Sequence, residues 1–266
     1  MNRLLTLLMV LFLAGPSMAD SQLKRFRTVD DSRGWEAVGR LDFAGRSFCT
    51  GTLISERYVL TAAHCLYDIR TKQQHRPADV TFRMAWLNGR AVAQRTAVAI
   101  HVHPSFSIKS GRPQDRLVND IALIELRRPV TELNVRPFGT SSRPEKGQQV
   151  GVVSYAHDRA DSASLQETCH VLARQGGVLV TSCDVDFGSS GAPIFDMTHG
   201  RPRIVSVVSA KAQFRGQRVS VGTALDGALE DLMRMAQSGS TSFRKADLGA
   251  LPELTGTEFV VGVAGR

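Results

Sequence analysis

The sequence predicts an all-β protein made of antiparallel barrels or sandwiches, and three observations lead to this fold class. Short apolar runs rich in β-branched residues recur along the chain, separated by Gly, Pro, Asn or charged residues. Many short strands at such spacing favour antiparallel barrels or sandwiches. A helical period occurs in one segment near the end, and no internal repeat of fixed length is present.

A polar segment divides the expected strands into two groups. This segment, NVRPFGTSSRPEKGQQ at residues 134–149, contains Pro137 and Pro144 and is expected to link two β halves. The strands of the first half are expected over residues 37–43, 48–55, 58–65, 78–86, 97–103 and 120–126. Those of the second half are expected over residues 148–155, 178–183, 192–195 and 203–210.

The helical pattern lies near the end of the second half. Leu225, Leu229, Leu232 and Ala236 recur at steps of three or four residues, and Thr223 precedes them as an expected N-cap. The pattern predicts a helix over residues 223–237. Beyond it the composition turns to Ser, Gly and Thr, followed by the short apolar stretch FVVGV. Residues 238–266 therefore form a C-terminal extension to which the sequence assigns no role.

The first residues, MNRLLTLLMVLFLAGPSMAD, have the pattern of an export signal. Arg3 is basic, an apolar run follows, and Ser17-Met18-Ala19 is a small-x-small triplet. A membrane anchor is the alternative, but Leu4–Leu13 is about half of the ~20 residues that a spanning helix needs. We therefore expect a signal peptide over residues 1–19 and no membrane anchor after its removal. The location is expected to be secreted or periplasmic.

The charge balance is basic, with 33 Lys and Arg residues against 25 Asp and Glu and a net charge of +8. Such an excess is compatible with nucleic-acid binding. The basic residues are scattered, however, with no aromatic-interleaved patch and no recognisable binding module. Nucleic acid is therefore not an expected partner.

Four cysteines, Cys49, Cys65, Cys169 and Cys183, are expected to form disulfides in an exported chain. Zinc is the alternative, but neither pair has the close spacing of a structural zinc site. CHVLARQGGVLVTSC reads as a hairpin around Gly176-Gly177, which sets Cys169 opposite Cys183. Facing Cα atoms about 4.5–5.5 Å apart suit a disulfide. Cys49–Cys65 then follows by elimination.

One histidine, one aspartate and one serine stand in motifs that suit acyl transfer. This chemistry needs a nucleophilic hydroxyl, an imidazole to take its proton, a carboxylate to orient the imidazole, and N–H donors for the oxyanion. TAAHC contains His64, NDIAL contains Asp120, and GSSGAP contains Ser190. Each motif alone is more often an ordinary surface, strand or turn segment. Their joint occurrence in an exported protein favours a catalytic triad.

The motifs CTGTLISERYVLTAAHC, NDIALIEL, GSSGAPIF and RIVSVVSA resemble the trypsin/chymotrypsin-like serine peptidases, above all their secreted bacterial branch, which includes the glutamyl endopeptidases. The resemblance covers about residues 29–237. It implies a chymotrypsin-like fold of two six-stranded antiparallel β-barrels, at about 35–133 and 150–222, with a C-terminal helix packed on one. It also implies a bond between the cysteines that end TAAHC and precede TGTLIS. Residues 20–28 then form a possible N-terminal propeptide segment.

The resemblance also selects Ser190 over its neighbour Ser189, because the family's nucleophile directly precedes a Gly-x-Pro sequence. Gly188 lies two residues earlier and can turn its backbone without a Cβ clash. The N–H groups of Gly188 and Ser190 are therefore expected to form the oxyanion hole. His101, His103 and His170 are alternative bases, or His101-x-His103 half of a metal site. No third ligand pattern accompanies them, so no metal is expected.

The resemblance further implies a specificity pocket formed by Asp184, Ser209 and Lys211. Asp184 is six residues before Ser190, where trypsin-like members carry an acidic residue at the pocket base, which favours cleavage after Arg or Lys. Lys211 stands where the family often has Gly, and is expected to fill the pocket or pair with Asp184. Val208 stands where glutamyl endopeptidases carry a histidine, so specificity for acidic residues loses its usual support.

Ser189 departs from the animal digestive members, which carry an aspartate there that binds a newly freed N-terminal ammonium. A neutral Ser189 cannot form that ion pair, and the usual IVGG start is also missing. We therefore expect neutral hydrogen bonds and the Cys169–Cys183 bridge to hold the oxyanion loop, although trimming between Lys24 and Thr28 stays open.

The expected function is a secreted serine endopeptidase acting on peptide or protein substrates through an acyl-enzyme on Ser190, without a cofactor. A non-catalytic binding protein on the same fold is the alternative. The sequence carries no signal for the oligomeric state or the physiological substrate.

Overall fold

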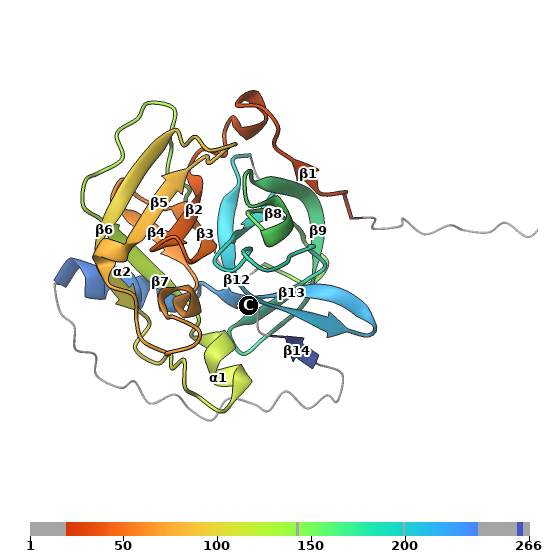
Figure 1. The fold of residues 1–266 in the computed structure, drawn as a ribbon. Coiled ribbons are helices and arrows are strands. Elements are labelled where there is room, and N and C mark those ends of the chain that lie inside the picture. The colour runs from red at the N-terminus through yellow and green to blue at the C-terminus, as the bar shows by residue number, and fades with distance from the viewer. Residues whose placement is uncertain (1–19, 142–143, 199, 239–259, 263–266) are drawn as a thin grey trace, which may run out of the picture.

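The computed structural model describes residues 20–141, 144–198, 200–238 and 260–262. Two antiparallel β-barrels lie side by side, and helix α2 (Ala228–Ser238) follows the second barrel (Figure 1). The expected all-β fold of two six-stranded barrels is confirmed. The signal peptide expected over residues 1–19 and nearly all of the extension over residues 238–266 lie outside the described residues.

The first barrel is a closed ring of six strands in the order β2-β3-β4-β7-β6-β5. Alternation along the strands sets its core: in β5, Val80, Phe82 and Met84 are buried while Thr81 and Arg83 are partly exposed. The strands are β2 (Val38–Phe43), β3 (Ser47–Leu53), β4 (Tyr58–Thr61), β5 (Val80–Met84), β6 (Ala93–Val102) and β7 (Ala122–Leu126). Short 3-10 helices cover Asp30–Ser32, Ala63–Leu66 and Pro77–Asp79.

The second barrel closes because β8 pairs with both β9 and β11. Its strands are β8 (Gln149–Ser154), β9 (Ser164–Gln175), β10 (Val178–Thr181), β11 (Pro193–Asp196), β12 (Arg203–Phe214) and β13 (Gln217–Ala224). Two short strands add to this sheet, β1 (Lys24–Arg25) on β9 and β14 (Val260–Gly262) on β12. A further 3-10 helix covers His157–Arg159.

The helical region differs from the expectation at its start. Helix α2 begins at Ala228 rather than at Thr223, because Thr223 and Ala224 complete β13 and Gly227 turns the chain with a φ of 70°. Thr223 is not an N-cap: its hydroxyl donates to the Leu117 carbonyl at 2.6 Å. Strand β13 and helix α1 (Pro113–Val118) were not expected from the sequence.

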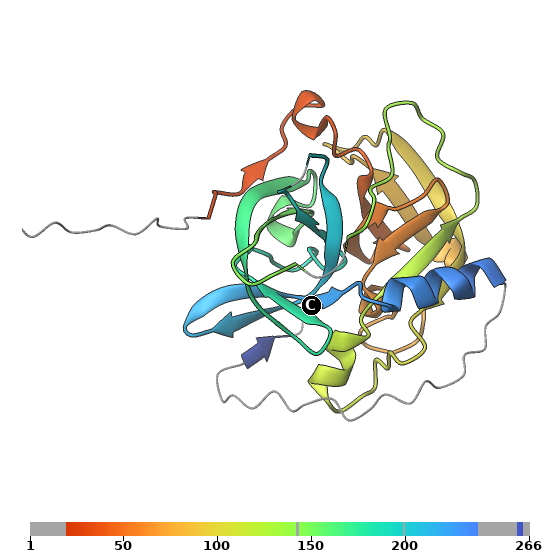
Figure 2. The same ribbon diagram turned by 180° about the vertical axis from the view of Figure 1, so that it is seen from behind.

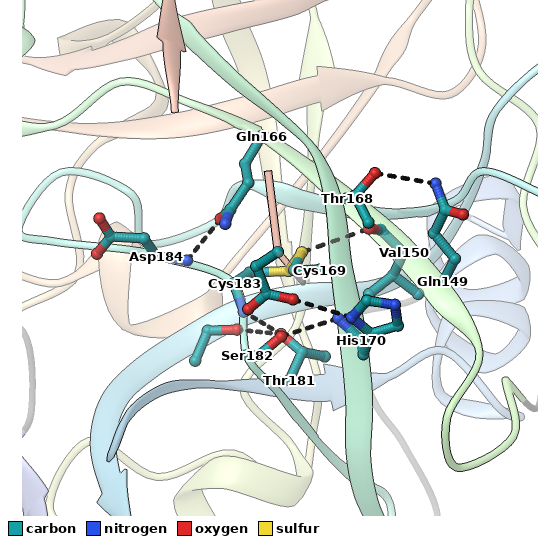
Figure 3. Close-up of a disulfide and its surroundings, with 12 residues drawn as sticks. Gln149, Val150, Gln166, Thr168, Cys169, His170, Thr181, Ser182, Cys183 and Asp184 are labelled. Carbon is teal, nitrogen blue, oxygen red and sulfur yellow. Dashed lines mark hydrogen bonds and ion pairs between the residues drawn. A yellow bond between two sulfur atoms is a disulfide. The ribbon is translucent and has the colours of Figure 1, made fainter. Parts of the chain in front are cut away.

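Both disulfides have the expected pairing, with Cα atoms 6.3 Å apart for Cys49–Cys65 and 5.0 Å apart for Cys169–Cys183. The second bridge depends on a register shift in the β9–β10 hairpin. Val178 faces Gln175 at the tip, but Thr181 faces Val171, so one extra residue stands in β9. This shift brings Cys169 opposite Cys183 (Figure 3).

The N-terminal segment packs along the second barrel. Ser21 donates its N–H to the Thr168 carbonyl at 2.8 Å, and β1 pairs with the start of β9. Phe26 is 4% exposed and belongs to the main apolar core. Both views show β1 beside β9 (Figures 1 and 2). Residues 20–26 of the expected propeptide segment are thus a packed part of this structure.

No helix within the described ranges has the length and apolarity that crossing a bilayer requires.

Candidate active site

Strand pairing in the first barrel brings His64 and Asp120 together. Antiparallel strands β4 and β7 pair so that Thr61, at the end of β4, faces Ala122, at the start of β7. His64 follows Thr61 in a 3-10 helix, and Asp120 precedes Ala122. Both residues therefore lie at the same end of the strand pair.

The contacts between His64 and Asp120 fix the imidazole. His64 Nδ1 lies 2.6 Å from Asp120 Oδ2, and the His64 backbone N–H donates to Asp120 Oδ1 at 2.8 Å. The hydroxyl of Ser209, on β12, also donates to Asp120 Oδ2. Because Asp120 is 3% exposed, these donors replace the water that would otherwise solvate its charge. With the proton on Nδ1, Nε2 is free to accept one.

Burial and the carboxylate act in opposite directions on the pKa of His64. Burial disfavours the charged imidazolium, while the Asp120 charge and its hydrogen bond favour it. The attraction of Asp120 prevails, so the pKa of His64 is raised above its ordinary value. The pair therefore stabilises the protonated imidazolium that a general base becomes.

Ser190 lies in the loop before β11, two residues after Gly188. Gly188 has a φ of 94°, and a Cβ there would lie 2.5 Å from a ring carbon of Phe48. Only glycine fits this position without displacing the ring. Among the described residues, the N–H groups of Gly188 and Ser190 have no hydrogen-bond acceptor. Two N–H donors are thus available for a developing oxyanion.

Thr50 of β3 holds this loop against the first barrel. Its N–H donates to the Ser190 carbonyl at 2.9 Å, and its hydroxyl donates to the Gly188 carbonyl at 3.0 Å. The same hydroxyl accepts the N–H of Tyr155 at 3.0 Å. Gly191 makes the close approach possible, since a Cβ there would lie 2.1 Å from Thr61 Oγ1.

Ser190 is 4% exposed, and within the described part of the chain its hydroxyl makes no hydrogen bond to His64. Nucleophile and base contacts are often long in the absence of substrate and tighten in the complex.

Neutral hydrogen bonds surround Ser189, which is fully buried. Its hydroxyl donates to Ser154 Oγ at 3.1 Å and accepts the N–H of Asp186 at 3.3 Å. Its own N–H donates to the Asp186 carbonyl at 2.9 Å. The loop is therefore closed on itself by uncharged groups around Ser189.

The three residues expected in a specificity pocket have different contact partners in the structure. Ser209 contacts Asp120, as described. Asp184 has an exposed side chain, and its N–H donates to Gln166 Oε1 at 2.7 Å (Figure 3). The expected pairing of Lys211 with Asp184 is wrong: Lys211 Nζ lies 2.6 Å from Asp186 Oδ1. Asp186 is nearer to Ser190 in the chain than Asp184 is, and it lies close enough to β12 to contact Lys211.

The alternative bases have partners away from the triad. His101 lies 3.7 Å from Glu125, His103 accepts the Ser105 N–H at 3.3 Å, and His170 lies 2.9 Å from Asp20. Cys49, His64 and Cys65 form a group with metal-ligand spacing. Both sulfurs are in the disulfide, so neither can act as a thiolate ligand.

Sequence reasoning missed three contributors to the site. Asp186 does not belong to a recognisable functional motif. Thr50 stands between Cys49 and Gly51 in a predicted strand, where its residue type indicates no special role. Ser209 was assigned to the pocket rather than to Asp120. The motif order could not reveal these contacts because each joins different strands or loops.

Comparisons with known proteins show which family and fold this chain shares. A sequence model of the trypsin family matches residues 27–226. Among curated proteins, the chain is 31% identical over 132 residues to serine protease grass of Drosophila melanogaster, covering 45% of this chain and 34% of the relative. It is 30% identical over 149 residues to neutrophil elastase of Mus musculus, covering 56% and 51%. Both alignments thus span about half or less of the relative's length.

Among solved structures, that of a Glu endopeptidase superposes with a TM-score of 0.67 at 19% identity, covering 81% of this chain and 97% of that chain. At this identity the superposition shows that the two chains share a fold, and nothing beyond the fold. The family match extends over both barrels and includes His64, Asp120 and Ser190 in its range. The chain therefore belongs to the trypsin family of serine proteases.

Proposed function

We propose that the chain is a secreted serine endopeptidase with Ser190 as nucleophile, His64 as general base and acid, and Asp120 as the residue that orients His64. The observation that carries the proposal is the partly buried contact of 2.6 Å between His64 Nδ1 and Asp120 Oδ2. Membership of the trypsin family supports the same assignment.

The proposed reaction has two halves. Ser190 Oγ attacks the scissile carbonyl carbon while His64 Nε2 takes the hydroxyl proton, and the N–H groups of Gly188 and Ser190 stabilise the oxyanion. The C–N bond breaks as His64 returns the proton to the leaving amine, leaving an acyl group on Ser190. Water then attacks this ester with His64 again as base. The products are an acid, an amine and the free enzyme.

The proposal for location rests on the N-terminal sequence and the cysteines. Disulfides persist in oxidising compartments, and the described chain contains two. Together with the signal pattern over residues 1–19, they support export to the periplasm or the medium.

A binding protein without activity is the second candidate. The observation that favours it is the absence, within the described residues, of a hydrogen bond from Ser190 to His64. A single labelling experiment can separate the two functions.

The test is covalent labelling with a fluorophosphonate probe. The wild type is expected to react, with the label on the peptide that contains Ser190, whereas Ser190→Ala and His64→Ala are expected not to react. Ser189→Ala is the matched control and should keep the label. Circular dichroism of each variant verifies folding. Labelling that survives Ser190→Ala would overturn the assignment of Ser190 as the nucleophile. A folded wild-type protein that shows neither labelling nor peptidase activity would favour the binding protein.

A further inference from the structure

One edge of β12 leads from the Ser190 loop to the C-terminal strand. The edge pairs first with β11, up to Val207 opposite Pro193. It then meets the Ser190 loop, since Gly191 N–H donates to the Val208 carbonyl at 2.8 Å and Val208 N–H donates to the Ala192 carbonyl at 2.9 Å. Farther along the same strand, β14 pairs with residues 211–213.

Strand β14 belongs to this edge rather than to the opposite one. The opposite edge of β12 is occupied by β13 from Ser206 to Phe214. Figures 1 and 2 both show β14 beside the β12–β13 hairpin. Ser209 and Ala210 therefore lie on an edge between the Ser190 loop and β14.

The direction of β14 is toward the triad. It runs antiparallel to β12, with Val260 opposite Gln213 and Gly262 opposite Lys211. The chain of β14 thus runs along β12 from Gln213 toward Ser209, whose hydroxyl contacts Asp120. A peptide on this edge with the direction of β14 presents its carboxyl-terminal end to Ser190. The edge is therefore suited to the substrate residues that precede the scissile bond.

We propose that β14 is an intramolecular occupant of this edge and competes with substrate for it. The inference rests on the proposed function, because competition requires a substrate that pairs with β12. Strand addition is a general mode of peptide recognition in which main-chain hydrogen bonds supply affinity and side-chain pockets supply specificity. The chain's own segment can therefore occupy the edge that also accepts many substrates.

The tether sets the expected size of the effect. Residues 239–259 join β14 to α2, and tethered segments commonly act at an effective concentration of about 1 mM. If the free peptide binds with a Kd of about 100 μM, about nine-tenths of the molecules are occupied, and kcat/KM falls about tenfold.

The first experiment measures kinetics of full-length variants. Hydrogen-bonded pairs alternate along an antiparallel ladder, so Val261→Pro with Gly262→Pro removes an N–H donor in either register. This double variant is expected to lower KM about tenfold with kcat unchanged. The matched control places two prolines outside β14, at Asp247→Pro with Leu248→Pro, and should behave as the wild type. Equal KM values for all three proteins would overturn the inference.

The second experiment detects the contact without catalysis. A synthetic peptide of residues 255–266 is titrated calorimetrically into the Val261→Pro, Gly262→Pro protein that also carries Ser190→Ala. Binding near 100 μM is expected, and the same peptide with both prolines should not bind. Absence of binding by the natural peptide would overturn the inference. Since this assay needs no turnover, a protein that binds the peptide but never cleaves substrate contradicts the proposed function and leaves the contact established.

Discussion

Lys211 Nζ lies 2.6 Å from Asp186 Oδ1, so an ion pair joins β12 to the loop that carries Gly188 and Ser190. The same ammonium lies 3.9 Å from the centre of the Phe187 ring. Partial burial raises the pKa of Asp186, but the Lys211 ammonium, the Phe187 N–H and the charge of Arg159 together hold this pKa below its ordinary value. Both side chains remain accessible, at 35% and 45% exposure.

Removal of the ammonium should change the preference for charged substrates. Lys211→Met leaves the Asp186 carboxylate unpaired near Ser190, where it attracts cationic side chains. Water screens this partly exposed group, so we expect the ratio of kcat/KM for peptides with Arg over Glu before the scissile bond to rise about tenfold. Lys211→Arg keeps the pair and should keep the wild-type ratio. An unchanged ratio in Lys211→Met would place Asp186 outside the substrate's reach.

Asp184 provides a separate test of the expectation that the enzyme cleaves after Arg or Lys. If the exposed Asp184 carboxylate binds the substrate cation, Asp184→Ser should lower kcat/KM for Arg peptides about tenfold or more while sparing uncharged ones. Profiling of cut sites in a peptide library measures both. Cleavage after Arg that is the same in wild type and Asp184→Ser contradicts this role.

The pH profile should follow His64. The base must be neutral, and its pKa is raised above 6.5, so kcat/KM should increase with pH through a midpoint above that value. Asp120→Asn removes the charge that raises the pKa and the acceptor that sets the tautomer. The midpoint of the pH profile of this variant should move to lower pH, and its kcat should fall about 10,000-fold. A midpoint that is unmoved in an otherwise active Asp120→Asn protein would assign the titration to another group.

Ser209 should act through Asp120. Ser209→Ala removes a hydrogen bond to a buried carboxylate, and such bonds contribute about 1.5–3 kcal/mol, so kcat should fall about tenfold or more. Because Asp120 loses a donor, the midpoint of the pH profile should also shift. Ser206→Ala is the matched control: it lies on the same strand, and its hydroxyl donates to the Thr223 carbonyl at 2.8 Å, away from Asp120. A fall in kcat of equal size in both variants would indicate a general packing effect.

The N-terminal segment should contribute to stability and not to a charge switch. Phe26→Ala is expected to lower the free energy of unfolding by about 3–5 kcal/mol, because a buried aromatic side chain is lost. Variants that start at Asp20, Thr28 or Val29, with and without one extra residue, should show no gain in turnover from any particular free N-terminus. An increase by orders of magnitude that one added residue abolishes would establish the switch and contradict the role given to Ser189.

Most of the strands could be predicted from the sequence because each depends on a local pattern. Period-two runs identify half-buried strands, and the His64, Asp120 and Ser190 motifs are short and specific. The hairpin argument also found Cys169–Cys183, although the bulge that aligns the two cysteines was not foreseen.

Long-range contacts could not be predicted in this way. Thr223 fits a cap by its residue type, but the chain continues there as β13 since Ser206–Ala224 and Val178–Thr223 pairing extends that far. The Lys211 partner depends on how the loop at Asp186 folds toward β12, which no spacing rule gives. Thr50 reaches across to Gly188 and Ser190, far apart from it in sequence.

Thr50 also allows a matched test. Thr50→Val keeps the shape but removes the hydroxyl that contacts the Gly188 carbonyl and the Tyr155 N–H, whereas Thr50→Ser keeps it. The valine variant should lose about tenfold or more in kcat and about 1–3 kcal/mol in the free energy of unfolding, because a buried N–H is left unsatisfied. The serine variant should retain most of both. Equal kcat in wild type and Thr50→Val would show that the loop needs no support from β3.

The Thr50 contacts also bear on when activity arises during folding. Each disulfide closes within its own barrel, so no covalent link holds the two barrels together at the site. In a chain in which only the second barrel has folded, His64 is not positioned beside Ser190. The Ser190 loop also lacks its hydrogen bonds to Thr50. We expect such a chain to be inert even with both bridges formed. We therefore expect hydrolytic competence to require the docking of one barrel on the other and to be lost when the barrels separate.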